Sequence, residues 1–69
     1  MTRCTIKVNG EPLELPSPVF VDAVVAAIVD SASGIAVAID RVVVPRSLWA
    51  TTQVAAGSSV EIVTAAAGG

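Results

Sequence analysis

The sequence predicts a small α+β domain in which a mixed sheet of four to five strands carries one helix packed across one face. Apolar and polar residues alternate in short stretches near both ends of the chain, which is typical of strands with one buried face. Between these stretches, valines recur at helical spacing. Because the chain has only 69 residues, we expect one core and no separate catalytic half.

The first hairpin is predicted by residues 4–15. Its apolar positions before the turn alternate, at Cys4, Ile6 and Val8. Asn9-Gly10 follows at once, and this pair tolerates positive φ at both central positions of a tight turn. The chain therefore returns over residues 11–15, with Leu13 and Leu15 pointing inward.

A helix is predicted after Pro16-Ser17-Pro18. Proline cannot donate to a sheet ladder, so it ends the second strand, while Ser17 and Pro18 suit an N-cap and a first helical position. The inward stripe of the helix comprises Val21, Val24, Val25, Ile28 and Val29. The opposite, solvent-facing stripe comprises Asp22, Ala26 and Asp30, and residues 31–34 end the helix.

The second half of the chain predicts another hairpin and a last strand. Residues 35–39 and 42–44 form the hairpin around a turn at Asp40-Arg41, and Pro45 closes it. Residues 46–57 are expected to form an irregular connection, and residues 59–64 a strand with Val60 and Ile62 inward. The predicted domain is 1–64, followed by a flexible tail, 65–69, and the order of elements is the ubiquitin-like β-grasp layout.

Composition argues against several classes of function. The net charge is -2 and the four basic residues are dispersed, so we expect no nucleic-acid partner. With one cysteine and no histidine, neither an internal disulfide nor a Cys/His zinc cluster can form, and no metal is expected. The longest apolar run, Ala23–Val29, is far shorter than the roughly 20 residues that span a bilayer, so we expect no membrane association. The N-terminus lacks the apolar stretch of a secretory signal, which favours a cytoplasmic location.

Three features in a fixed order extend over most of the chain. They are the hairpin Val8-Asn9-Gly10-Glu11, the block from Ile35-Ala36-Val37-Ala38-Ile39-Asp40 through Val44-Pro45-Arg46 to Trp49, and the ending from Val60-Glu61-Ile62-Val63-Thr64 to Gly69. In these features the chain resembles the sulfur-carrier proteins of thiamine biosynthesis, the ThiS family, which have the β-grasp fold and end in Gly-Gly. The chain departs from the family at Ala66-Ala67, where a larger or polar residue is common, and this departure bears on partner affinity.

The resemblance implies that the working group is the C-terminal carboxylate of Gly69 and that the protein is a carrier and cosubstrate rather than an enzyme. A partner adenylating enzyme, similar to ThiF, would use ATP with Mg²⁺ to convert this carboxylate to an acyl-adenylate, and the carrier itself would bind no cofactor. Sulfur from a cysteine persulfide would displace AMP, and the thiocarboxylate would donate its sulfur to a thiazole synthase similar to ThiG. The partners would recognise Ala65, Ala66, Ala67 and Gly68 as the approach to Gly69.

The other candidate residues have structural interpretations beside the functional ones. Arg46 and Trp49 are candidates for partner docking, with free surface and core packing as the respective alternatives. Cys4 shares strand parity with Ile6, so we interpret it as a core residue rather than a reactive thiol. Asp22 and Asp30 are interpreted as solvated charges, and the serines lack a histidine base.

Alternative functions stay open at this point. The small subunit of molybdopterin synthase also ends in Gly-Gly, and a carrier could serve another sulfur-containing metabolite. A ubiquitin-like modifier would instead join Gly69 to lysine amines of target proteins. A plain interaction domain would have no use for the terminal glycines.

Overall fold

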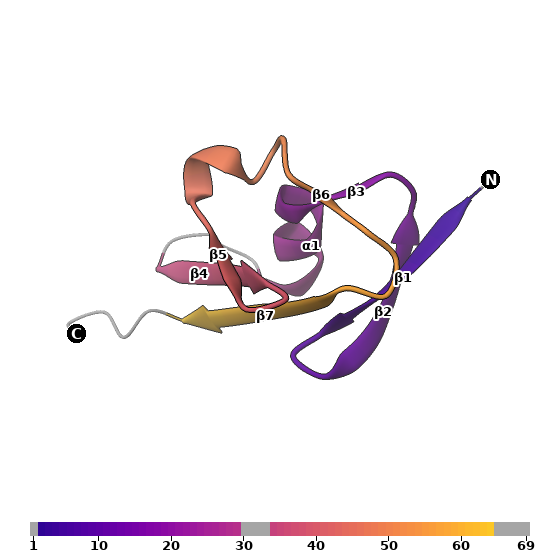
Figure 1. The fold of residues 1–69 in the computed structure, drawn as a ribbon, viewed down its shortest axis with the longest axis horizontal. Helices are drawn as coiled ribbons and strands as arrows, with labels where there is room; N and C mark the ends of the chain where they lie inside the picture. The colour runs from indigo at the N-terminus through magenta and orange to yellow at the C-terminus, as the bar shows by residue number, and fades with distance from the viewer. Residues whose placement is uncertain (1, 30–33, 65–69) are drawn as a thin grey trace.

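A computed structural model describes residues 2–29 and 34–64 of the chain. Within these residues, five strands form one mixed sheet in the order β2-β1-β7-β4-β5 (Figure 1). The strands are β1 (Arg3–Val8), β2 (Glu11–Pro16), β4 (Ile35–Ile39), β5 (Val42–Val44) and β7 (Ser59–Thr64). The neighbours β1 and β7 run parallel and the other neighbouring pairs run antiparallel. This arrangement confirms the predicted mixed sheet.

Both predicted hairpin turns are confirmed by their backbone angles. Asn9 and Gly10 join β1 to β2 with φ values of 51° and 85°, and Asp40 and Arg41 join β4 to β5 with φ values of 48° and 72°. Two successive residues with positive φ define a type I′ turn, whose twist matches that of the strands it joins.

The helix α1 (Val21–Ile28) begins three residues later than the predicted start at Pro18. Val19–Phe20 instead form a short strand, β3, which pairs with β6 (Gln53–Val54). The first helical N–H groups bond to the backbone of the connection between β5 and β6. The Val21 N–H, for example, donates to the Thr52 carbonyl at 3.0 Å. The free N–H groups at the start of the helix therefore find acceptors in a distant part of the chain rather than in a serine cap.

The predicted inward stripe of the helix is correct for Val21, Val24 and Val25, which are buried. It is wrong for Ile28, which is the last residue of the helix and is 44% exposed. Val29 follows the helix and is partly buried against the core. Asp22 and Ala26 are exposed as predicted, whereas Asp30 lies outside the described residues.

The connection predicted as irregular contains two short regular elements. A 3₁₀ helix spans Arg46–Leu48, and β6 follows at Gln53–Val54. Neither element is long enough to carry a periodic pattern, and β6 exists as a strand because β3 lies beside it.

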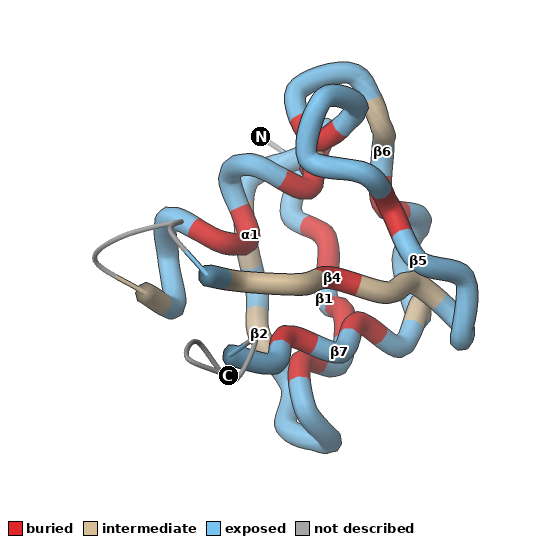
Figure 2. The backbone as a smooth tube through the Cα atoms, turned by 90° about the vertical axis from the view of Figure 1, so that its left-hand side faces the viewer, coloured by how far each residue is buried: buried red, intermediate tan, exposed pale blue. Residues whose placement is uncertain are grey.

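A single core lies between α1 and one face of the sheet. Along β1 and β7, buried and exposed residues alternate (Figure 2), so only one face of each strand contributes to this core. The predicted inward positions Val60 and Ile62 are buried, and Leu13 and Leu15 are partly buried against the core. The opposite face of the sheet is not covered by α1, and the candidate site described below lies on this uncovered face.

The two outer strands offer few hydrogen-bonding groups to another chain. In such a hairpin the residues that flank the two-residue turn, Val8 and Glu11, form a hydrogen-bonded pair. Backbone groups alternate in direction along a strand, so in β2 those of Pro12, Glu14 and Pro16 face away from β1. Two of these three residues have no backbone N–H. By the same alternation, Val43 is the only residue of β5 (Val42–Val44) whose backbone N–H and C=O groups face away from β4. None of the helices in the described ranges has both the length and the apolar character needed to cross a bilayer.

Candidate functional site

The strand β7 carries the chain to the predicted tail. It lies in the centre of the sheet, between β1 and β4, and its last residue, Thr64, pairs with Ile35 (Figure 1). The predicted site residues Gly69, Gly68 and Ala65–Ala67 lie outside the described residues. The structure therefore describes the strand from which these residues continue and the surface beside it.

Residues of the two hairpin turns hold β7 by its edges. Asp40 donates its backbone N–H to the Ser59 carbonyl at 2.8 Å, and its carboxylate accepts the Ser59 N–H at 3.0 Å. On the other edge, Asn9 donates its backbone N–H to the Val60 carbonyl at 2.9 Å. The side chain of Asn9 extends further along β7 and bonds to both backbone groups of Ile62.

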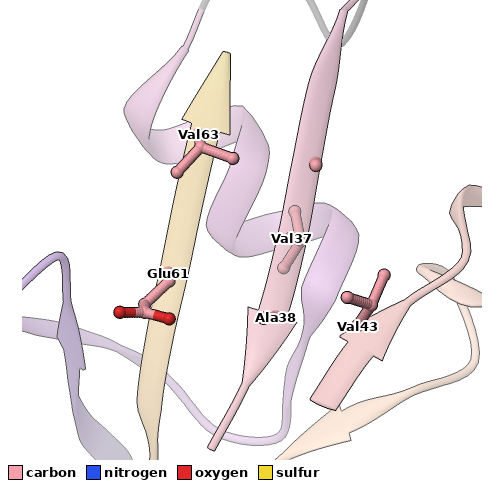
Figure 3. Close-up of a pocket in the computed structure, with 6 residues that line it drawn as sticks. Val37, Ala38, Val43, Glu61 and Val63 are labelled. Carbon is pink, nitrogen blue, oxygen red and sulfur yellow. The ribbon is translucent and has the colours of Figure 1, made fainter. Parts of the chain in front are cut away.

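The uncovered face of the sheet carries apolar side chains next to the end of β7. Ala36 lies beside Val63, and Ala38 lies between Glu61 and Val43 in the strand register. Figure 3 shows Glu61 and Val63 on β7 and Val43 on β5, on either side of β4, with α1 behind the sheet. We call Ala36, Ala38, Val43, Glu61 and Val63 the open-face patch; together with Val37 they line a shallow hollow of ≈ 110 Å³.

The open-face patch is apolar at its centre and carries one charge. Val43 is 69% exposed and Val63 is 56% exposed, so two valines present most of their surface to solvent. Glu61 supplies a carboxylate within the same hollow. Such a surface suits a partner that covers the valines and brings a cation to Glu61.

The structure places Trp49 in the core. This residue is 5% exposed, and its indole Nε1–H donates to the Val44 carbonyl at 2.9 Å. The Trp49 carbonyl accepts the Asp22 N–H at 3.2 Å, so this residue connects β5 to the first turn of α1. Trp49 thus has the packing role that was the alternative to docking.

The neighbouring Arg46 is exposed at the start of the 3₁₀ helix. Its guanidinium carbon lies 5.8 Å from the centroid of the Trp49 ring, within the range of a cation–π contact. Of the predicted docking pair, Arg46 is the residue with surface to offer, and its docking role stays a prediction.

The remaining candidates have structural roles. Cys4 is buried, and its thiol points to the Val54 carbonyl with 4.0 Å between sulfur and oxygen, in agreement with the core interpretation. Among the described residues, no three side chains of His, Cys, Asp or Glu gather in a group that could hold a metal ion.

Sequence reasoning missed the open-face patch and the side-chain bonds of Asn9. A signal for the patch was present, because the small residues Ala36 and Ala38 alternate with larger apolar ones along β4. The pattern separates two faces of a strand but does not say which face the helix leaves uncovered.

The arrangement of one helix on a mixed five-stranded sheet, with the two ends of the chain contributing parallel central strands, defines a ubiquitin-like β-grasp domain. The crystal structure of a thiamine biosynthesis protein (ThiS) from Geobacter metallireducens superposes on it with a TM-score of 0.76. The two chains are 25% identical, and the match covers 87% of this chain and 91% of the other.

The model of the ThiS family matches residues 3–69, so this chain belongs to the ThiS family. No curated protein sequence gives a significant match to the chain. Family membership supports a role as a small sulfur-carrier protein in thiamine biosynthesis rather than as an enzyme.

Proposed function

We propose that this protein carries sulfur for the thiazole ring of thiamine as a thiocarboxylate on Gly69. The observation that carries the proposal is that the ThiS family model matches the chain from residue 3 through Gly68-Gly69. The solved structure that the chain resembles is itself named a thiamine biosynthesis protein. Because the match includes the two terminal glycines, the proposal places the chemistry on the C-terminal carboxylate rather than on a side chain.

In this proposal an adenylating enzyme of the ThiF type activates the carrier. The Gly69 carboxylate attacks the α-phosphorus of ATP, with Mg²⁺ bound in the enzyme, and pyrophosphate leaves. A free carboxylate is a poor electrophile, whereas its acyl-adenylate has AMP as a leaving group. The terminal sulfur of a cysteine persulfide then displaces AMP to form an acyl disulfide, and a second thiol cleaves its S–S bond and leaves the thiocarboxylate on Gly69. The thiocarboxylate supplies its sulfur to a thiazole synthase of the ThiG type. These steps are assigned to the cytoplasm.

The residues before Gly69 give access to the partner's active site. Glycine has no Cβ, so Gly68-Gly69 can enter a narrow cleft and leave the carbonyl carbon open to a nucleophile. Five residues span at most roughly 17 Å when fully extended. Gly69 can therefore react in a buried site while the β-grasp domain stays outside. The small side chains of Ala65, Ala66 and Ala67 suit the same cleft.

The open-face patch is the proposed docking surface for the adenylating enzyme. Continuity favours this assignment, because the patch includes Val63, the residue directly before the end of β7 at Thr64. A partner seated on Val43 and Val63 would hold the domain beside the start of the tail and raise the effective concentration of Gly69 at the active site. Arg46 does not line this hollow and remains a second docking candidate.

The test is an incubation of the purified chain with the adenylating enzyme, Mg-ATP, a cysteine desulfurase with L-cysteine as the persulfide source, and a thiol reductant, followed by intact-mass measurement. We expect the mass to rise by the difference between a sulfur and an oxygen atom. The matched control is the same chain with Gly69 converted to a C-terminal amide, which keeps every side chain and removes only the reactive group.

Three results would contradict the proposal. One is that the mass of the free-acid chain stays unchanged although the same adenylating enzyme preparation modifies its own native carrier protein. Another is sulfur incorporation by the amide form. The third is the appearance of Gly69 linked to lysine amines of larger proteins, which would favour the modifier alternative instead.

A further inference from the structure

The side chain of Asn9 acts as a substitute peptide group beside the end of β7. Its Oδ1 accepts the Ile62 N–H at 2.9 Å, and its Nδ2 donates to the Ile62 carbonyl at 3.1 Å. Both bonds are partly buried and join residues 53 positions apart in the sequence. One side chain thereby pairs both backbone groups of a single residue on β7.

These bonds occur where the regular sheet has ended on that edge of β7. The strands β1 and β7 pair only through Lys7 with Ser59 and Val8 with Val60. After Val8 the chain turns into β2 and leaves β7. On the opposite edge, β4 continues to pair as far as Thr64. Without the side chain of Asn9, the described residues of β7 after Val60 would be hydrogen-bonded along one edge alone, to β4.

Asparagine meets two requirements at this position that other residues do not meet together. Its φ of 51° lies in the left-handed region, which asparagine and glycine tolerate best. Its primary amide carries both a donor and an acceptor, as a peptide group does. Aspartate would keep the acceptor and lose the donor, and glycine would keep only the backbone conformation.

We propose that Asn9 is a positioning residue for the carrier reaction, because it fixes the course of β7 at Ile62, two residues before Thr64, from which the sequence continues to Gly69. This inference rests on the proposed function. Ile62 lies between Glu61 and Val63, two residues of the open-face patch, so the same bonds also hold the β7 side of that patch in place.

The chain contains a matched control at Asp40. This residue also occupies the first position of a two-residue turn, has a φ of 48°, and bonds through its side chain to β7. Its partner is Ser59, at the beginning of the strand and five residues before Thr64. Asn9→Gly removes two partly buried side-chain bonds and Asp40→Gly removes one exposed bond; both variants keep the positive φ, and they act at opposite ends of β7.

The experiment compares these two variants and Asn9→Asp with the unsubstituted chain. Amide hydrogen exchange of Ile62, with Ile6 as a reference for global opening, measures the local anchoring. The steady-state rate of thiocarboxylate formation with the adenylating enzyme gives kcat and KM for the carrier. Thermal unfolding records the global stability of each variant.

We expect Asn9→Gly to speed exchange at Ile62 more than at Ile6 and to lower kcat about threefold or more, since a less firmly held end of β7 presents the reactive group in the attacking geometry less often. Asp40→Gly should lower the unfolding temperature less, because it removes one exposed bond, and should leave kcat unchanged. Asn9→Asp should fall between Asn9→Gly and the unsubstituted chain, because it retains the bond to the Ile62 N–H.

The inference is overturned if exchange at Ile62 does not respond to Asn9→Gly, or if Asn9→Gly and Asp40→Gly change kcat equally. A failure of the unsubstituted chain to form a thiocarboxylate is a different result. It would refute the proposed function, and with it the kinetic role of Asn9, whatever the exchange data show.

Discussion

Replacing Trp49 with phenylalanine separates a role in the core from a role in docking. The residue is 5% exposed, and its indole Nε1–H donates to the Val44 carbonyl at 2.9 Å. Phenylalanine keeps an aromatic ring in this space but has no donor, so the substitution removes one hydrogen bond and part of the ring volume. It leaves the surface of the domain almost unchanged.

The expected loss is about 2 kcal/mol. Losing one buried hydrogen bond costs about 0.5–1.5 kcal/mol, and the smaller ring adds a contribution from incomplete packing. A domain of 69 residues has a free energy of unfolding of about 3–10 kcal/mol at typical values per residue. The variant therefore remains folded, whereas Trp49→Ala, which costs about 3–5 kcal/mol, brings the domain close to unfolding.

Urea denaturation followed by far-UV circular dichroism measures this loss, because the variant has no tryptophan fluorescence. With an m-value of about 1 kcal/mol/M, the midpoint should fall by about 2 M. The KM of the adenylating enzyme for the carrier should be unchanged under conditions where the variant is folded. An unchanged urea midpoint together with a raised KM would refute the core interpretation and favour docking through the indole ring.

Three further predictions follow from burial and from the strand edges. Val43→Asp should raise the KM of the adenylating enzyme about tenfold with less than about 0.5 kcal/mol change in stability, since Val43 is 69% exposed; an unchanged KM would argue against the patch as the docking surface. Val24→Ala should cost about 2 kcal/mol and Ile28→Ala less than about 1 kcal/mol by urea denaturation, and equal losses would contradict the observed end of α1. The double variant Pro12→Thr/Pro16→Thr should self-associate more than the unsubstituted chain in sedimentation experiments, because it gains two outward N–H groups on β2; identical sedimentation would show that the prolines do not protect this edge.

The sequence predicts those elements whose determinants are local. The turn at Asn9-Gly10 is specified by two residues that tolerate positive φ, and the alternation on either side of it sets which side chains face the core. The last strand is predictable for the same reason, because Val60 and Ile62 are buried on alternate positions.

Elements that depend on distant partners are predicted less well. Ser17 and Pro18 have the chemistry of a helix start, yet the helix begins at Val21, where the Thr52 carbonyl accepts the first N–H. The open-face patch was missed for a related reason. Val43 and Val63 come from strands far apart in the sequence and lie on one surface only because β4 separates them in the sheet.

Sheet geometry also restricts how a partner can bind this domain. Adding a strand to a sheet edge is a common mode of recognition, but it needs a row of outward N–H and C=O groups. Pro12 and Pro16 remove two N–H groups from the β2 edge, and the described part of β5 is three residues long. The uncovered face therefore offers a partner more contact surface than either sheet edge does. On this face, Val63 belongs to the strand that leads to the tail. Binding on that face would hold the domain and set the starting point of the reactive segment in a single event.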